Sequence, residues 1–88
     1  MTEQKITIRN RAGVHARPAA ILVEAAKNYA SVIYFEKNNS RINAKSILGI
    51  MSLGAGYGSE INIIAEGDDE KDAVAALARL FELKFEEE

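Results

Sequence analysis

The stretch Gly13–Ala20, GVHARPAA, contains the only histidine of the chain, followed by an arginine two residues later and a proline three residues later. Proline is favoured in the first turn of a helix, so we expect a helix to begin near His15, at Ala16 or Pro18. The first backbone N–H groups of a helix have no intrahelical partner, and together with the guanidinium of Arg17 they suit an anion such as phosphate. The residue types therefore predict an imidazole, a helix N-terminus and a permanent positive charge at one place.

The remaining sequence indicates which chemistry this histidine can perform. A metal site needs further ligands, and the chain has no cysteine to supply them. A hydrolytic triad would need a serine and a carboxylate arranged around the imidazole, and no such motif is visible. General acid–base catalysis and an ordinary surface or capping role stay open. The best fit is a neutral nitrogen of His15 that attacks a phosphoryl group held by Arg17, which predicts a phosphoryl carrier.

Length and composition exclude several classes of protein. The 88 residues suffice for one small domain spanning 1–88, and the absence of cysteine excludes disulfides and a thiol nucleophile. No apolar run reaches about 18 residues, the length of a membrane span. The N-terminal sequence MTEQKITIRN lacks the apolar core of a signal peptide. We therefore expect a cytoplasmic protein that does not insert into a membrane.

Charge is distributed unevenly along the chain. Residues 1–45 contain eight Lys and Arg against three Glu, a net charge of +5, whereas residues 46–88 contain three against ten Asp and Glu, a net charge of −7. The basic half includes His15 and suits an anionic ligand or an acidic partner. It is too weakly basic to predict nucleic-acid binding, and the acidic half predicts a solvated helix.

Hydrophobic periodicity predicts seven elements in the order β-α-β-β-α-β-α. Strands are expected at residues 5–9, 31–37, 40–43 and 60–65, and helices are expected after His15, at 46–53 and at 69–85. The economical packing is an α+β domain, in which one four-stranded antiparallel sheet carries three helices on one face. The other face should meet water and carry Lys5, Thr7 and Asn62.

Two helical stripes should face the core. They are Ala19, Leu22, Val23, Ala26 and Ala30 in the first helix, and Val74, Leu77, Ala78, Phe81 and Phe85 in the last. Asp68 or Asp69 is the expected N-cap of the last helix.

The short helix expected at 46–53 has more apolar residues than one buried face can hold. At about 100° per residue, Ile50 and Leu53 lie on one side, which we expect to be buried. The other side should stay exposed as a docking surface for partners and holds Ile47, Leu48 and Met51. Ile21 lies opposite the buried stripe of the first helix and extends this predicted patch, which also includes Ala20, Lys27 and Lys45.

Gly13–Ala20 resembles the phosphorylation-site motif of the HPr family, the histidine-containing phosphocarriers of the bacterial phosphoenolpyruvate–sugar phosphotransferase system. Residues 43–54, NAKSILGIMSLG, resemble the second motif of this family, and the chain length and element order match as well. The resemblance implies an open-faced β-sandwich. It also implies that the Nδ1 atom of His15 accepts a phosphoryl group from phosphorylated enzyme I and passes it to a histidine of sugar-specific IIA domains, while Arg17 steadies the group.

Ser46 precedes the short helix, and serine is a preferred N-cap, so capping is its first predicted role. In HPr proteins of the Gram-positive type the matching serine is phosphorylated by HPr kinase/phosphorylase, and members from bacteria without that kinase also carry a serine there. The resemblance thus implies a regulatory site at Ser46, with this kinase and a catabolite-control regulator as further partners. We expect a monomer that needs no cofactor or metal and binds no nucleic acid.

Other functions match parts of the sequence. An RNA-binding α+β domain needs paired aromatic residues on central strands, whereas here Tyr34 and Phe35 occur in one strand only. A purely regulatory relative that acts through Ser46 should lack the histidine, and His15 is present. A nitrogen-type paralogue has the same active site, so that alternative stays open, as do the sugars and IIA domains that the protein serves.

Overall fold

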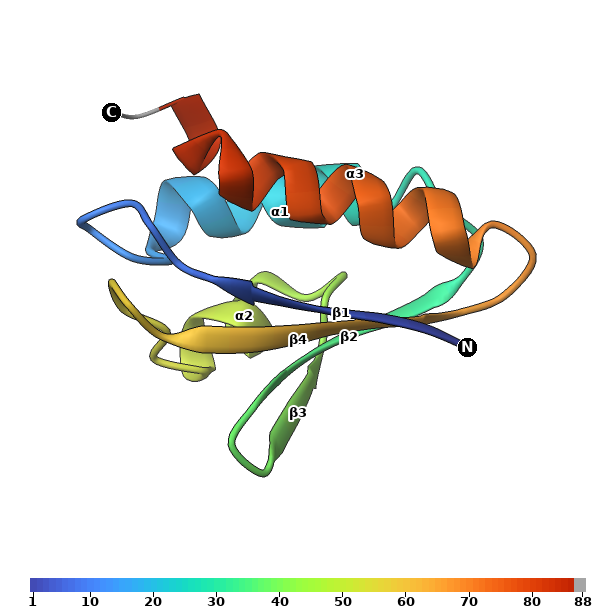
Figure 1. The fold of residues 1–88 in the computed structure, drawn as a ribbon, viewed down its shortest axis with the longest axis horizontal. Coiled ribbons are helices and arrows are strands. Elements are labelled where there is room, and N and C mark those ends of the chain that lie inside the picture. Colours follow the sequence, from blue (N-terminus) through green and yellow to red (C-terminus); the bar gives the residue numbers. More distant parts are fainter. Residues whose placement is uncertain (87–88) are drawn as a thin grey trace.

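The computed structural model describes residues 1–86, and its elements follow the expected order (Figure 1). The strands are β1 (Thr2–Thr7), β2 (Val32–Lys37), β3 (Ser40–Asn43) and β4 (Glu60–Glu66). The helices are α1 (Ala16–Ala26), α2 (Ile47–Ser52) and α3 (Glu70–Glu82), and a short 3₁₀ turn, η1 (Lys84–Glu86), follows α3. Strand β1 lies earlier than the predicted 5–9, because its pairing with β4 ends where Thr7 meets Glu60.

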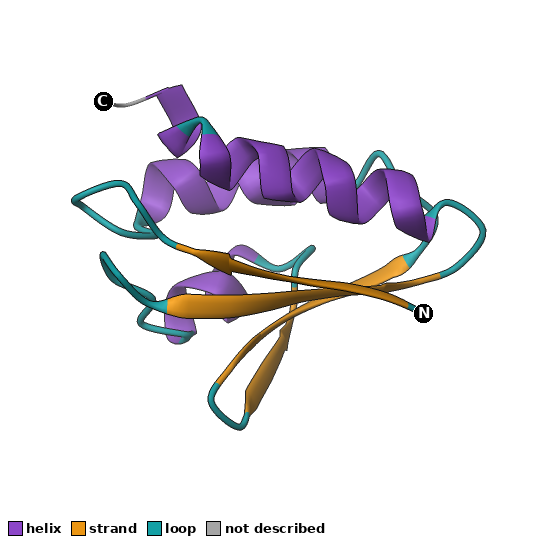
Figure 2. Cartoon of the chain, viewed as in Figure 1, coloured by secondary structure: helices purple, strands orange, loops and turns teal. Residues whose placement is uncertain are grey.

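The four strands form one antiparallel sheet in the order β1-β4-β2-β3. The helices pack on one face and leave the other face open, so the predicted α+β open-faced β-sandwich is confirmed (Figure 2). Strand β4 lies between β1 and β2, although it is the last strand in the sequence. The first and last strands of the chain are therefore neighbours in the sheet.

The hydrophobic core lies between the sheet and the helices. Ile33 and Phe35 of β2 and Ile61 and Ile63 of β4 are fully buried on the covered face. Phe35 meets Phe81 of α3 edge-on, with ring centroids 5.8 Å apart. Burial of each such side chain contributes about 1.5–3 kcal/mol, so these contacts hold the helical layer onto the sheet.

The predicted helical stripes face this core, with two differences at their ends. Ala30 is exposed because α1 ends at Ala26, four residues earlier than the stripe required. Phe85 is buried, but α3 ends at Glu82 and Phe85 lies in η1 with a φ of 54°. Its ring returns onto the core and packs edge-on against Phe81 at 5.2 Å. The other predicted stripe residues are all buried: Ala19, Leu22, Val23, Ala26, Val74, Leu77, Ala78 and Phe81.

The open face of the sheet is mostly polar, as expected from Lys5, Thr7 and Asn62. One residue differs from this expectation. Ile64 of β4 lies on the open face and yet is only 2% exposed. Glu3 of β1 and Tyr34 of β2 are its partners in the sheet register, so neighbouring side chains on the same face flank this isoleucine.

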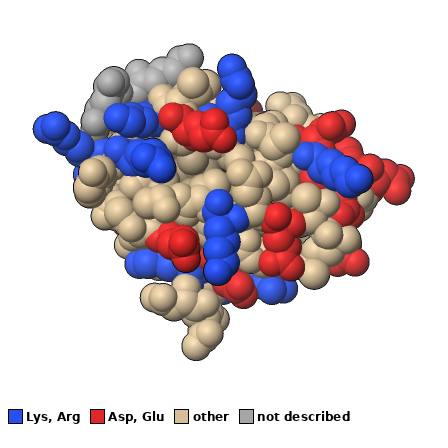
Figure 3. Space-filling model, viewed as in Figure 1, with Lys and Arg blue, Asp and Glu red and all other residues tan. Residues whose placement is uncertain are grey.

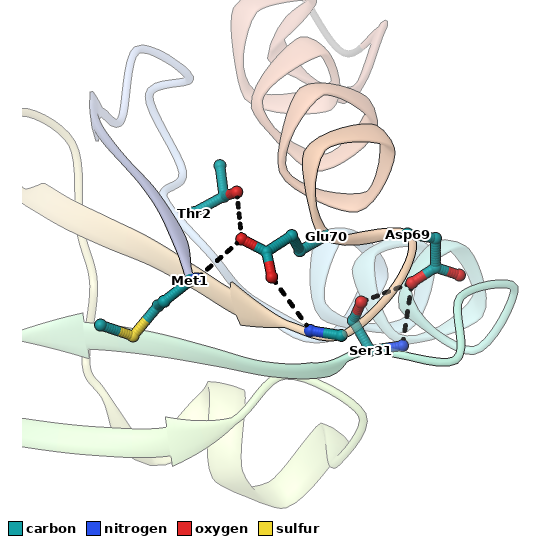
Figure 4. A network of polar contacts seen from close by, with 6 residues as sticks. Met1, Thr2, Ser31, Asp69 and Glu70 are labelled. Carbon is teal, nitrogen blue, oxygen red and sulfur yellow. Dashed lines mark hydrogen bonds and ion pairs between the residues drawn. The ribbon is translucent and has the colours of Figure 1, made fainter.

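A network of carboxylates joins the start of α3 to two distant parts of the chain (Figure 4). Asp69 occupies the predicted N-cap position, but its side chain forms no capping hydrogen bond to α3. Its carboxylate instead accepts hydrogen bonds from the backbone N–H of Ala30 at 2.8 Å and of Ser31 at 3.0 Å, and from the Ser31 hydroxyl. The Ser31 hydroxyl and these backbone donors lower the pKa of Asp69. Asp69 thus fixes the segment between α1 and β2.

Glu70 provides the second half of this network. Its carboxylate accepts hydrogen bonds from the Thr2 hydroxyl at 2.6 Å and from the Gly67 backbone N–H at 3.2 Å, and it pairs with the Met1 ammonium group at 2.9 Å. The pKa of Glu70 is lowered to about 2, mainly by the hydrogen bond from the Thr2 hydroxyl and next by that from the Met1 ammonium group. The start of β1 is therefore tied to the start of α3 through a carboxylate that stays ionised under mildly acidic conditions.

We expect Glu70→Gln to lower the stability of the protein at neutral pH and to change its dependence on acid. Because the pKa of Glu70 is lowered from 4.5 to about 2, its contribution is complete above pH 4.5 and is lost as the pH falls toward 2. The difference in unfolding free energy between the wild type and Glu70→Gln should therefore shrink over this interval. Urea unfolding at several pH values measures it.

Glu24→Gln, which neutralises an exposed carboxylate on α1, is the matched control. It should leave the pH dependence of stability close to that of the wild type. An equal acid response in the wild type and Glu70→Gln would show that the Glu70 contacts do not stabilise the fold.

Candidate functional site

His15 is the N-cap residue of α1, and its side chain is exposed. Its backbone is extended, with φ −102° and ψ −165°, and its side chain makes no capping hydrogen bond. The α1 hydrogen-bond ladder begins with the N–H of Ala19, which donates to the carbonyl of His15 at 2.9 Å. The imidazole therefore stands at the positive end of the helix dipole.

The helix begins at Ala16, the earlier of the two predicted starts. The N–H groups ahead of the helical ladder belong to Ala16 and Arg17, because Pro18 has no N–H. Pro18 is buried and fixes the backbone of the first turn. It was predicted as part of the anion-binding helix start, and there it can shape the backbone but cannot donate a hydrogen bond. Arg17 is exposed on this first turn, beside His15 in the chain.

The loop before His15 is fixed by its own hydrogen bonds. Asn10 is 1% exposed, and its side-chain amide donates to the carbonyl of Gly13 at 2.7 Å. The N–H of Gly13 donates back to the carbonyl of Asn10 at 3.1 Å. Gly13 has a φ of 72°, which agrees with the unusual backbone angle expected for this glycine.

The segment 53–59 between α2 and β4, hereafter the connector, forms hydrogen bonds with the same loop. The N–H of Val14 donates to the carbonyl of Ala55 at 2.9 Å. A Cβ atom on Gly13 would lie 2.8 Å from both the Ala55 carbonyl oxygen and the Gly56 Cα atom. The connector also bonds to the start of the loop, since the N–H of Ile8 donates to Ser59 at 2.9 Å. The position of His15 therefore depends on a segment some forty residues further along the chain.

The connector is held in turn by a side chain from β2. The ammonium group of Lys37 lies 3.2 Å from the carbonyl oxygen of Gly54 and 3.5 Å from that of Leu53. Leu53 is the C-cap of α2 and Gly54 follows it, so this cation lies just beyond the C-terminal end of α2, where it interacts favourably with the helix dipole. Nothing in the local sequence around Lys37 indicates this contact, because the two segments are adjacent only in the folded chain.

Helix α2 divides its apolar residues as predicted. Ser46 is its N-cap, and the Ser46 hydroxyl oxygen accepts a hydrogen bond from the N–H of Gly49 at 3.1 Å. Ile50 and Leu53 are buried, whereas the opposite side is exposed to the extent of 44% at Ile47, 82% at Leu48 and 44% at Met51. We call these three residues the α2 patch. The predicted exposure is confirmed, and a six-residue helix thus presents three large apolar side chains to solvent.

Helices α1 and α2 lie side by side and run in opposite directions. The ammonium group of Lys45, just before α2, donates to the carbonyl of Tyr29 beyond the C-terminal end of α1 at 2.8 Å. At its other end α2 leads into the connector, which contacts the loop before His15. Ser46 therefore lies near the far end of α1, and Met51 lies in the half of α2 that is closer to His15.

The remaining predicted docking residues are distributed along α1. Ala20 is half-buried, and Lys27 is exposed at the C-cap. An 11-residue helix is about 16 Å long, so Lys27 is remote from His15 and close to the start of α2. Ile21 is half-buried and packs against the core, so it contributes less exposed apolar surface than its predicted position opposite the buried stripe suggested. The structure thus places the His15 end and the α2 patch on two neighbouring helices.

Residues 1–86 lack both the side-chain grouping of a metal site and the long apolar helix of a membrane span. No group of three or more His, Cys, Asp and Glu in this part of the chain could hold a metal ion. Within the same residues, no helix has the length and apolar character needed to cross a membrane.

Comparison with known proteins gives consistent matches over the whole chain. A family model described as "PTS HPr component phosphorylation site" matches residues 2–82. The phosphocarrier protein HPr of Treponema pallidum (strain Nichols) is 50% identical over 88 residues, which cover 100% of both chains. The HPr-like protein Crh of Bacillus subtilis (strain 168) is 44% identical over 78 residues, 89% of this chain and 92% of the relative. The crystal structure of HPr-C-His from Thermoanaerobacter tengcongensis has a TM-score of 0.97 and 52% identity, covering 100% of this chain and 99% of that one.

We expect Gly13→Ala to destabilise the fold and to displace His15. The left-handed backbone of Gly13 alone would cost an L-residue about 1–2 kcal/mol, and the new Cβ would overlap the connector backbone at 2.8 Å. Urea unfolding measures the loss of stability, and the chemical shifts of the His15 ring report its displacement. Gly56→Ala is the matched control, because a Cβ there meets no atom within 4 Å. Equal stability of the two variants would contradict the role of the connector.

Proposed function

Because the chain belongs to the HPr family of phosphocarriers of the phosphotransferase system, we propose that His15 is the residue that carries its phosphoryl group. The observation that supports this proposal is the place of His15, exposed at the N-cap of α1 with Arg17 on the first helical turn. As in other members of its family, the protein is a carrier and not an enzyme. Residues 1–88 act as one phosphocarrier domain.

The transfer needs only the groups at this helix start. The lone pair of the neutral Nδ1 atom of His15 attacks the phosphorus of phosphorylated enzyme I, forming an N–P bond. The bond between phosphorus and the donor breaks, and its electron pair leaves with the donor. The helix dipole and the guanidinium of Arg17 stabilise the negative phosphoryl oxygens during the exchange and in the phosphorylated protein. The reverse attack, by a histidine of a IIA domain, releases the group, and no cofactor is required.

Partners dock on the surface that surrounds this site. The family has enzyme I and IIA domains as its partners. The α2 patch supplies an apolar surface that can contact partners of different shape, because the methionine side chain is flexible. The proposed docking surface consists of Ala20, Ile21, Lys27, Lys45, Ile47, Leu48 and Met51. Lys45 contributes mainly by orienting α2, since its ammonium group already binds the Tyr29 carbonyl.

Ser46 is a regulatory site in this proposal. Its hydroxyl oxygen caps α2, and the residue borders the α2 patch. Phosphorylation would add about −1.5 to −2 charges there, which a helix N-terminus tolerates but an acidic partner would not. An HPr kinase/phosphorylase and a catabolite-control regulator are the corresponding partners. In this proposal the protein is a monomer in the cytoplasm. The presence of His15 argues against a purely regulatory role, in which a relative would act only through the serine.

We expect His15→Ala to abolish phosphoryl acceptance while the fold is retained, because the side chain is exposed and makes no capping hydrogen bond. Incubation with phosphoenolpyruvate, magnesium and enzyme I should add one acid-labile phosphate to the wild type and none to the variant, as measured by intact-protein mass spectrometry. Circular dichroism provides the control for folding. A folded His15→Ala protein that still accepts an acid-labile phosphate would contradict the assignment.

We expect Ser46→Asp to slow phosphoryl transfer from enzyme I about tenfold, a change of about 1.4 kcal/mol in the activation barrier. Aspartate caps a helix as well as serine does, so the added charge beside the α2 patch is the cause. Ser46→Asn keeps a capping side chain without the charge and should transfer at nearly the wild-type rate. Rapid-quench kinetics distinguishes the variants, and unchanged transfer in Ser46→Asp would restrict Ser46 to its capping role.

A further inference from the structure

Basic residues are concentrated at one end of the fold and acidic residues at the other, although Glu60 and Glu82 lie on the same surface as Arg9. Residues 6–23, which lead from the end of β1 into the first half of α1, contain Arg9, Arg11 and Arg17 and no Asp or Glu. The turn between β4 and α3, at the other end of the sheet, contains four acids within residues 66–70. Blue side chains accordingly gather at the end where the β1–α1 loop lies, and red ones at the opposite end (Figure 3). The net charge of −2 is therefore the sum of an uneven distribution of positive and negative side chains.

Two of these arginines are not used by the proposed site. Arg9 and Arg11 lie in the loop between β1 and α1, where they alternate with the buried residues Ile8 and Asn10. This alternation places both arginines on the exposed side of the loop, and both are exposed. They therefore lie at the same end of the molecule as His15 but on a different segment from the α2 patch.

The loop that carries these arginines has a fixed backbone. The N–H of Ile8 donates to Ser59 and the N–H of Gly58 donates to Ile8 at 2.8 Å, so the residue before Arg9 is bound to the connector on both sides. The hydrogen bonds between Asn10 and Gly13 hold the residues on either side of Arg11. A charged group on a fixed backbone loses less conformational entropy on binding than one on a mobile loop.

We propose that Arg9 and Arg11, together with Arg17, form a basic rim that binds acidic side chains of the phosphoryl-donor protein and accelerates its association with the His15 end. This inference rests on the proposed function and adds a second contact region to the α2 patch, on the β1–α1 loop. Each guanidinium has five N–H donors, so contacts within the chain still leave donors for the carboxylates of a partner. The α2 patch contributes apolar contact area, and the rim contributes attraction and orientation.

An acidic protein surface fits this rim better than a nucleic acid does. The three arginines lie at one end only, whereas the acids near the β4–α3 turn would repel an extended polyanion along the rest of the molecule. Among the four strands, Tyr34 is the one aromatic residue on the open face, because Phe35 beside it points into the core, so this face has no row of rings for base stacking. A folded partner with a local acidic patch meets the basic end without approaching the acidic one.

The double variant Arg9→Gln/Arg11→Gln tests the proposal through transfer kinetics with enzyme I. The second-order rate constant for phosphorylation of His15 should fall about three- to tenfold at low ionic strength, and the difference should diminish above about 0.15 M salt. The final extent of phosphorylation and the half-life of the isolated phosphohistidine should equal those of the wild type. The matched control, Lys5→Gln/Lys71→Gln, also removes two positive charges, one from the open sheet face and one beside the acidic turn. Both positions are exposed, and this variant should have nearly the wild-type rate constant.

Three results would overturn the inference while the proposed function stands. The first is an unchanged rate and salt dependence in Arg9→Gln/Arg11→Gln, and the second is an equal loss of rate in the control variant. The third is a shorter phosphohistidine half-life in Arg9→Gln/Arg11→Gln, because the arginines would then act on the phosphoryl group itself. If the wild type accepted no phosphate on His15, the proposed function and this inference would both fail.

Discussion

The backbone hydrogen bond from Val14 to Ala55, together with the close approach of Gly13 to the same segment, is the constraint on which the His15 end of the molecule depends. It joins the loop that leads into α1 to the connector that leaves α2. The start of α1, and with it the imidazole of His15, is therefore positioned by packing of two backbones. Only a residue without a side chain allows this approach at position 13, since a Cβ would stand 2.8 Å from the opposite backbone.

This contact also relates the proposed chemical and docking regions to each other. Helix α2 begins near the C-terminal end of α1, where Lys45 binds the Tyr29 carbonyl. It ends at the connector, where Lys37 binds the carbonyls of Leu53 and Gly54. A helix of six residues would be marginal by itself. Fixed at both ends, it can present an apolar surface to partners at a constant distance from His15.

The features that could be predicted from the sequence are those with a short-range cause. Local periodicity predicts the buried stripes of α1 and α3 and the hairpin of β2 and β3. It also predicts that Ile50 and Leu53 are buried while the α2 patch is exposed. The start of α1 next to His15 follows from the position of Pro18. The features that were missed depend on distant partners. Nothing near Ala30 indicates that Asp69 will bind the backbone there and that α1 ends before it, and nothing near Tyr57 indicates that its glycine-rich segment supports the His15 loop.

The absence of a capping hydrogen bond from the His15 side chain has an energetic consequence. A serine or aspartate in this position could accept a hydrogen bond from the N–H of Arg17, since Pro18 has none, and would stabilise the helix by about 1 kcal/mol relative to a residue that does not cap. The helix therefore forgoes this stabilisation at its own N-terminus. The proposed role of His15 therefore competes with helix capping for the same position, and the packing of Gly13 against the connector supplies the anchorage that the cap does not.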